Sequence, residues 1–163
     1  MSDKLLAREP VKRVQSALAA GGSSAQVIAL SETARTAADA AASLGVPVGA
    51  IVKSLVFAVD GQAVLALVAG DRQCAVEQLP AVLGLSGKPA RADADLVKQA
   101  TGFSIGGVAP VGHPQKLPTA IDESLGRFAQ IYAAAGHPHC VFATTLAELA
   151  GLTGGYVSAA LTN

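Results

Sequence analysis

The chain has 163 residues, of which 51% are hydrophobic, and its 12 basic side chains balance 12 acidic ones. A chain of this length buries about 70% of the surface that it exposes when unfolded, which is enough for one hydrophobic core without disulfides or metals. The neutral charge excludes a protein that holds long nucleic acids by neutralising many phosphates, so any contact with RNA must be local.

The composition also argues against several other classes of protein. With four Phe, two Tyr and no Trp, the chain lacks the aromatic platform of general single-strand binding proteins. Its two cysteines, Cys74 and Cys140, form no C-x-x-C pair, which argues against a disulfide framework and a structural zinc site. Charged residues such as Lys53 and Asp60 interrupt the most apolar stretch, and residues 1–10 lack the apolar core of a secretory signal. We therefore expect a cytoplasmic protein without membrane contact.

Turn and capping residues delimit four elements in the first half of the chain. Pro10 fits the first turn of a helix and Gly21 its end. Asp60 and Gly61 supply the positive φ angles of a tight turn between two apolar strands. The sequence predicts a helix over residues 9–20, a strand over 26–30, a helix from a cap at Ser31 or Thr33 to Leu44, and a hairpin of strands 51–59 and 62–69.

The second half of the chain predicts shorter elements. Asp93 caps a helix that ends before Gly102, and a glycine-rich apolar segment follows. The elements are helices over residues 75–83, 93–100 and 145–150, strands over 119–121, 130–133 and 141–143, and a helical turn over 122–128. Because strands and helices do not alternate regularly, we expect an α+β fold, in which helices surround a twisted, mixed and mostly antiparallel sheet in a single domain over residues 1–163.

Lys53 is the first candidate for a functional residue. It lies inside an apolar strand, and side-chain alternation places it on the same face as Ile51, Leu55 and Phe57. An ammonium group there must reach solvent at the margin of the sheet, pair with an acid, or face a cleft that holds an anionic or carbonyl ligand. Periodicity alone leaves these three roles open.

A second candidate is the glycine-rich loop formed by Gly106, Gly107, Val108, Ala109 and Pro110. Glycine lets main-chain amides approach a ligand closely, and proline stiffens the segment. Such amides can polarise a carbonyl group or hold an oxyanion. A glycine-rich turn without a ligand is the alternative, and the Walker phosphate-binding pattern is absent.

The remaining chemically active residues give weaker signals. His137, His139 and Cys140 are potential metal ligands, but no second tight pair completes the set, so a polar loop is the simpler interpretation. Asp122 follows a predicted strand and either faces a pocket or caps the next helical turn. No Gly-x-Ser-x-Gly elbow is present, and neither cysteine stands in a nucleophile motif. We therefore do not expect ordinary covalent triad chemistry.

A series of short motifs along the chain resembles the YbaK-like family, whose domain is found alone or inserted in bacterial prolyl-tRNA synthetases. Each motif is short, but the series covers most of the chain in order. The motifs are Leu44-Gly-Val, Ile51-Val-Lys-Ser-Leu-Val-Phe57, Ala69-Gly-Asp-Arg72, Arg91-Ala-Asp93, Thr101-Gly-Phe103, Gly106-Gly-Val-Ala-Pro110, Ile121-Asp-Glu-Ser-Leu125 and Ala134-Ala-Gly-His137.

The resemblance implies a fold, a reaction and a site. Members of that family have an α+β fold around a twisted mixed sheet and hydrolyse the ester that joins a wrong amino acid to a tRNA, often tRNA-Pro. Lys53 matches the family's strand lysine, which binds substrate and supports the rate, and Ser54 stands next to it. The main chain of the 106–110 loop would position the aminoacyl carbonyl, with Asp122 and His137 also at the substrate. The attacking group is then water or a hydroxyl of the substrate, and neither a metal nor a cofactor is implied.

The resemblance also bears on selectivity. The cysteine-removing branch of the family carries Tyr, Ser and Asp where this chain has Leu30, Ala134 and Val141. A pocket lined by small apolar groups favours alanine or another small side chain over cysteine, and serine and threonine fit less well. Because a hydrophobic pocket separates substrates by only about 1–3 kcal/mol per methylene group, close relatives overlap. The implied partners are the 3′ end of a mischarged tRNA and an aminoacyl-tRNA synthetase, with no duplex DNA.

Two other functions remain open at this point. The alternative is a non-catalytic module that binds nucleic acid or an aminoacyl nucleotide. Binding of tRNA without hydrolysis of the ester would identify it. The third hypothesis is a metal hydrolase that uses His137, His139 and Cys140. Bound metal and loss of activity with chelators would identify it.

Overall fold

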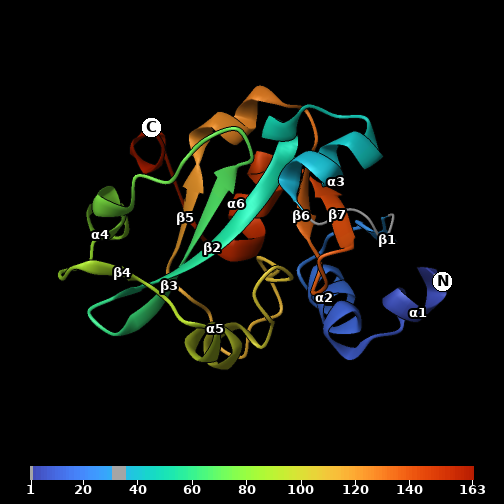
Figure 1. The fold of residues 1–163 in the computed structure, drawn as a ribbon, viewed down its shortest axis with the longest axis horizontal. Helices are drawn as coiled ribbons and strands as arrows, with labels where there is room; N and C mark the ends of the chain where they lie inside the picture. Colours follow the sequence, from blue (N-terminus) through green and yellow to red (C-terminus); the bar gives the residue numbers. More distant parts are fainter. Residues whose placement is uncertain (1, 31–35) are drawn as a thin grey trace.

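The structure, a computed structural model, describes residues 2–30 and 36–163. Its centre is one eight-stranded sheet with the strand order β1-β7-β6-β2-β3-β5-β8, and β4 adds to β2. Parallel and antiparallel pairs are mixed, and helices surround the sheet (Figure 1). This arrangement confirms the predicted α+β fold. No helix within the described ranges is long and apolar enough to cross a membrane.

Six α-helices, eight strands and four 3₁₀ turns make up the described fold. The helices are α1 (Ser2–Leu6), α2 (Glu9–Ala20), α3 (Ala37–Leu44), α4 (Leu79–Leu83), α5 (Ala94–Thr101) and α6 (Leu146–Thr153). The strands are β1 (Val27–Ala29), β2 (Ile51–Val59), β3 (Gln62–Ala69), β4 (Pro89–Arg91), β5 (Thr119–Asp122), β6 (Ile131–Ala134), β7 (Cys140–Thr144) and β8 (Tyr156–Ser158). The 3₁₀ turns are η1 (Val48–Ala50), η2 (Val76–Gln78), η3 (Glu123–Arg127) and η4 (Ala159–Leu161).

The β2–β3 hairpin follows from local sequence. Its antiparallel register runs from Val52 opposite Ala69 to Val59 opposite Gln62. The turn residues Asp60 and Gly61 adopt φ angles of 52° and 85°. These positive angles are what a two-residue hairpin turn requires, so the predicted strands and turn are confirmed.

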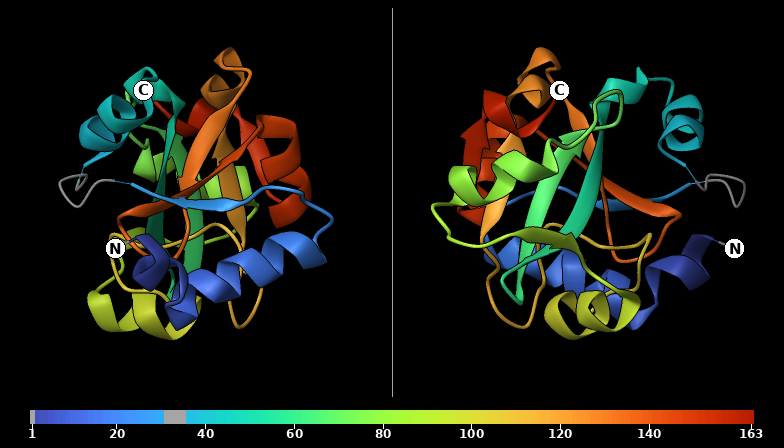
Figure 2. Two further views of the ribbon diagram at one scale, coloured as in Figure 1. Left: turned by 90° about the vertical axis from the view of Figure 1, so that its right-hand side faces the viewer. Right: turned by 60° about the vertical axis from the view of Figure 1, so that its left-hand side comes forward.

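The sheet separates two main groups of buried side chains. On one face, α2, α5 and α6 pack against strand residues that include Leu65 and Leu67. On the other face, α4 packs against the alternate residues Val64 and Ala66. A smaller cluster joins α3 to Ile51 of β2. Figure 2 shows α2 and α5 at one end of the molecule and α3 at the other.

The central strand β2 changes neighbours along one edge. It pairs in parallel with β6 at Ile51 and Val52, and in antiparallel with β4 at residues 57–59. Between these contacts, residues 53–56 have β3 on one side and no strand of the described chain on the other. The sheet is therefore interrupted beside Lys53.

Several boundaries differ from the sequence prediction. The helix predicted over residues 75–83 is split into η2 and α4, because Pro80 has no N–H to continue the helical ladder. The last helix runs through Gly151 to Thr153, and Gly154 ends it with a φ of 66°. The short elements α1, β4 and β8 were not predicted. The other predicted elements are present with slightly shifted ends.

The start of α3 also differs. The predicted caps Ser31 and Thr33 lie outside the described residues. In the structure, the helix begins after Thr36, whose hydroxyl accepts a hydrogen bond of 3.1 Å from the main-chain N–H of Asp39. Gly45 closes the helix in the left-handed conformation, with a φ of 70°.

Candidate active site

A cavity opens where β2 and β6 separate. It measures about 330 Å³ and lies among β2, β6, β7, the start of α3 and the segment between α5 and β5. Most of its lining is apolar. Among the residues that the sequence predicts for binding or selectivity, those that line this cavity are Lys53, Ser54, Gly106, Val108, Ala134 and Val141.

Lys53 is half-buried on β2, opposite Val68 of β3. Its Nζ donates a hydrogen bond of 2.6 Å to the main-chain carbonyl of Arg72, in the turn that follows β3. An ammonium group has three donors, and the described part of the chain offers this one no other acceptor. Two donors are therefore available to an oxygen atom of a ligand.

An ion pair holds the turn that accepts the Lys53 bond. The guanidinium of Arg127 donates two hydrogen bonds, of 2.7 and 2.9 Å, to the carboxylate of Asp71. These bonds lower the pKa of Asp71. Since the Asp71 side chain is 34% exposed, the pair contributes no more than about 1 kcal/mol to stability. Its main consequence is geometric, because it fixes residues 71–72 against η3.

Two residues of the 106–110 loop, Gly106 and Val108, line another side of the cavity. Gly106 has a φ of 95°, which only glycine adopts without strain. Gly107 packs so closely that an added Cβ would lie 3.0 Å from the Cα and N atoms of His137. The N–H groups of Val108 and Ala109 donate to no acceptor within residues 2–30 and 36–163. Both residues are buried, and buried amides are usually paired. Val108 lines the cavity, so an oxygen atom of a ligand there would give its amide an acceptor.

The loop between β6 and β7 borders the cavity through Pro138. The Nδ1 atom of His137 accepts a hydrogen bond of 3.1 Å from the N–H of His139. Burial lowers the pKa of His137, and the charges of His139 and Arg8 act in the same direction. The His137 ring is therefore neutral at pH 7. Among the described residues, no three His, Cys, Asp or Glu side chains are placed to hold one metal ion.

Neither cysteine has the properties of a nucleophile. Burial raises the pKa of Cys74 to about 11, with Glu77 adding to the shift and Lys53 opposing it. Burial also raises the pKa of Cys140. Both groups are protonated thiols at neutral pH, and thiols are far weaker nucleophiles than thiolates.

The residues predicted to set selectivity occupy different positions. Ala134 of β6 pairs with Val141 of β7, and both line the cavity. Leu30 does not line it, and instead packs in the cluster that joins α3 to Ile51.

The hydroxyl of Ser54 is buried and has no hydrogen-bond partner in the part of the chain that the structure describes. A polar group of a ligand would supply one.

Asp122 does not line this cavity. It is 0% exposed at the end of β5. Its carboxyl accepts hydrogen bonds from the N–H groups of Ala69 and Ser124 at 3.0 and 2.8 Å, and from the hydroxyls of Ser124 and Thr162 at 2.7 and 3.3 Å. Asp122 therefore ties β3, η3 and the C-terminal segment together, which is the capping role that the sequence left as an alternative.

Replacing Asp122 by alanine should mainly destabilise the fold. We expect Asp122→Ala to lower the free energy of unfolding by about 3–5 kcal/mol, because it leaves one buried donor and three partly buried donors without their acceptor. Asp93→Ala is the matched control, since Asp93 caps α5 at an exposed position and its loss should cost only about 1 kcal/mol. Urea denaturation of both variants measures the difference. Equal losses for the two variants would contradict the structural role of Asp122.

Some lining residues carry no signal in the sequence. Thr36 and Ala37 reach the cavity only because α3 folds over β2, and Tyr132 because β6 pairs with Ile51. Ile105 precedes Gly106 and could have been found as part of the glycine-rich segment. It is 62% exposed and forms part of the rim of the cavity.

Comparison with known proteins relates the sequence to editing domains. The model of the aminoacyl-tRNA editing domain family matches residues 31–152. The proline–tRNA ligase of Nitratidesulfovibrio vulgaris is 39% identical over 79 residues, which make up 48% of this chain and 14% of the ligase. The chain thus corresponds to a small part of that enzyme. An uncharacterized Bacillus subtilis protein, YwhH, is 32% identical over 70% of this chain and 72% of its own length.

The fold is similar to that of solved structures. One is the crystal structure of a protein to which a trans-editing role for prolyl tRNA synthetase is ascribed, with a TM-score of 0.89, 39% identity and coverage of 96% of this chain and 98% of that chain. The family model spans the segment that contains β2, the 106–110 loop and the loop after β6. The chain belongs to the aminoacyl-tRNA editing domain family.

Proposed function

We propose that this chain hydrolyses the ester bond of a mischarged aminoacyl-tRNA, namely tRNA-Pro that carries a small amino acid such as alanine. The observation that supports this most directly is the cavity beside β2. It brings the half-buried ammonium of Lys53 together with Gly106 and Val108 of the 106–110 loop, and the N–H of Val108 has no acceptor among the described residues. A cation and preorganised amides are suited to an ester carbonyl whose oxygen becomes negatively charged during hydrolysis.

In the proposed reaction, water attacks the carbonyl carbon of the aminoacyl ester. The carbonyl oxygen becomes an oxyanion, which the amides of the loop and the ammonium of Lys53 stabilise. The bond between the acyl carbon and the ribose oxygen then breaks. One proton of the attacking water goes to the ribose oxygen, the other goes to solvent, and the amino acid leaves as a free carboxylate. No protein nucleophile takes part, which is consistent with the raised thiol pKa values of Cys74 and Cys140. A preorganised donor of this kind accelerates acyl transfer by about 10²–10³-fold.

The cavity wall favours a small apolar aminoacyl group. Ile51, Ala134 and Val141 supply apolar surface, and no acidic side chain lines the cavity within the described residues. Such a wall discriminates by size rather than by specific hydrogen bonds, at about 1–3 kcal/mol per methylene group. We therefore expect alanine to be preferred, with partial activity on its close relatives.

The proposed RNA contact is limited to the 3′ end of the tRNA. The chain has no net charge with which to hold a long helix. Mischarged tRNA arises at a synthetase, so we propose the cytoplasm as the location and an aminoacyl-tRNA synthetase as a further partner.

The test is release of free amino acid from a panel of aminoacyl-tRNAs. Ala-, Cys-, Ser-, Thr- and Pro-tRNA-Pro are incubated with the wild-type chain, with and without a metal chelator. We expect alanine to be released fastest, the correctly charged prolyl ester to survive, and the chelator to have no effect. Binding of these tRNAs without release would establish a non-catalytic binding module instead, and loss of turnover on chelation would favour a metal hydrolase.

A further inference from the structure

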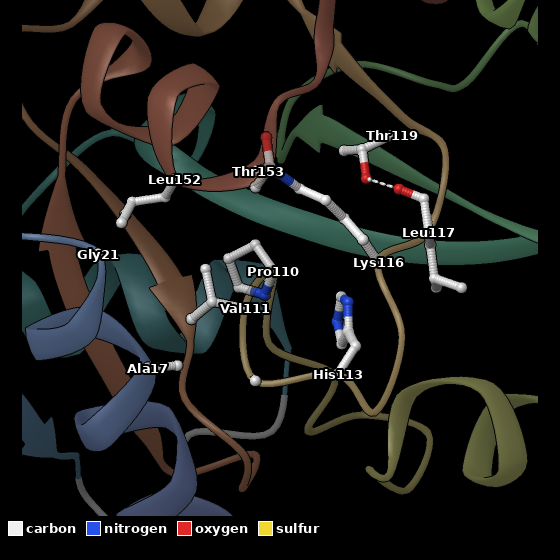
Figure 3. Close-up of a pocket in the computed structure, with 11 residues that line it drawn as sticks. Ala17, Gly21, Pro110, Val111, His113, Lys116, Leu117, Thr119, Leu152 and Thr153 are labelled. Atoms are coloured by element: carbon white, nitrogen blue, oxygen red, sulfur yellow. Dashed lines mark hydrogen bonds between the residues drawn. The ribbon is translucent and has the colours of Figure 1, made fainter.

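The side of the 106–110 loop remote from the proposed site meets a second, smaller cavity. This cavity measures about 200 Å³ and is lined by Pro110, Val111, His113 and Lys116, together with parts of α2 and α6. Figure 3 shows the His113 ring projecting into it beside Lys116, with Pro110 and Val111 across from the ring. His113 is thus the titratable ring immediately behind the loop.

His113 makes one specific polar contact with the loop. Its Nε2 atom lies 2.7 Å from the main-chain carbonyl oxygen of Ala109. A carbonyl oxygen only accepts hydrogen bonds, so Nε2 must carry the proton. Burial lowers the pKa of His113, and the charge of Arg13 adds to this effect while the bond to Ala109 opposes it. The ring is therefore a neutral Nε2–H tautomer at pH 7.

A chain of ring and charge contacts fixes His113 to α2. The His113 ring meets Phe103 edge to face, with ring centroids 6.1 Å apart. The guanidinium of Arg13 lies 4.6 Å from the centre of the Phe103 ring. Arg13 also donates a hydrogen bond of 2.7 Å to the carbonyl of Gly102. Both ends of the segment from Gly102 to His113 are thereby tied to one rigid helix.

We propose that His113 is a positioning residue that holds the Ala109–Pro110 peptide so that the preceding amides of the 106–110 loop face the aminoacyl ester. Pro110 has no N–H, so the Ala109 carbonyl is the single polar atom of this peptide that a hydrogen bond can hold. The N–H groups of Val108 and Ala109 lie in the two peptides immediately before it. Rotation of the Ala109 carbonyl would change the backbone angles that aim these amides. The inference rests on the proposed deacylase function.

The test compares two variants of similar size and shape. His113→Gln retains a side-chain N–H that can reach the Ala109 carbonyl, whereas His113→Met has a similar length without a donor. We expect His113→Met to lower kcat for Ala-tRNA-Pro by about tenfold or more with little change in KM, since small displacements of catalytic groups have effects of up to about 10²-fold. His113→Gln should recover most of the lost rate. Thermal unfolding is measured for both variants.

NMR spectroscopy of the ring and the loop gives a readout that does not depend on activity. We expect the ¹⁵N spectrum of wild-type His113 to show the Nε2–H tautomer. The amide signals of Val108 and Ala109 should shift in His113→Met and return toward their wild-type positions in His113→Gln.

Three results would overturn the inference while the proposed function stands. These are a folded His113→Met with the wild-type rate, a His113→Gln no better than a folded His113→Met, or an Nδ1–H tautomer in the wild type. If His113→Met does not fold, the inference is tested by the tautomer of His113 in the wild type and by the rate of His113→Gln. An inactive wild-type chain would instead refute the deacylase function itself.

Discussion

Lys53→Met is expected to lower the rate of deacylation by about 10²–10³-fold while the protein stays folded. The substitution removes the ammonium group but keeps an unbranched stem of similar length. The ammonium is proposed to stabilise the oxyanion, and loss of one such donor has an effect of this size. The fold should survive because Lys53 is half-buried, and the bond that it donates to the Arg72 carbonyl is worth about 1 kcal/mol. Single-turnover release of alanine from Ala-tRNA-Pro measures the effect.

The control for this variant is Lys88→Met. Lys88 is an exposed lysine just before β4 and does not line the cavity. Its loss removes the same charge from the molecule, so a general effect of charge on tRNA binding would appear in both variants. We expect Lys88→Met to retain the wild-type rate. A folded Lys53→Met with the wild-type rate would refute the central role of Lys53 in the proposed site.

Gly107→Ala is expected to reduce kcat by about tenfold or more, with a small change in stability. A Cβ at this position would lie 3.0 Å from the Cα and N atoms of His137. These are backbone atoms, so either the 106–110 loop or the backbone at His137 must move by a few tenths of an ångström. A displacement of the main-chain donors relative to Lys53 weakens stabilisation of the oxyanion, because catalysis is sensitive to shifts of this size. Steady-state kinetics on Ala-tRNA-Pro gives kcat and KM.

Gly151→Ala is the control, because it makes the same chemical change at a site where neither activity nor stability should fall. Apart from the adjacent residues and the backbone of its own helix, no atom of the described chain lies within 4 Å of the Cβ that would be added, and Gly151 is inside α6. Alanine in a helix is favoured over glycine by about 0.5–1 kcal/mol, so this variant should be slightly more stable and fully active. Similar kcat values for Gly107→Ala and Gly151→Ala would show that the position of the loop does not limit the reaction.

The site combines residues that differ in how well a sequence can reveal them. Lys53 is conspicuous because a charge interrupts an apolar strand, and the glycine loop because its composition is unusual. Thr36 and Tyr132 line the same cavity but look like ordinary surface and strand residues. Asp122 illustrates the opposite case, since an acid after a strand fits a site and a cap equally well, and only its four hydrogen bonds decide between them.

Local sequence determined the elements whose signals lie within a few neighbouring residues. The helix at Glu9–Ala20 starts and ends at its proline and glycine, and the β2–β3 hairpin follows from Asp60-Gly61 between alternating apolar residues. The order of short motifs also determined the family. These features are short-range because backbone sterics and side-chain alternation act between near neighbours.

Only the tertiary structure decided the features that depend on distant partners. Strands β4 and β8 have three residues each and exist because β2 and β5 offer edges for them to pair with. The cavity arises because β6 and β4 pair with different stretches of the same edge of β2, so residues 53–56 have no strand of the described chain on that edge. The segment that carries Ala109 and His113 is likewise held against α2, because Arg13 of that helix donates to the Gly102 carbonyl and lies over the Phe103 ring. Such contacts join segments far apart in the chain, and no local pattern encodes where those segments meet.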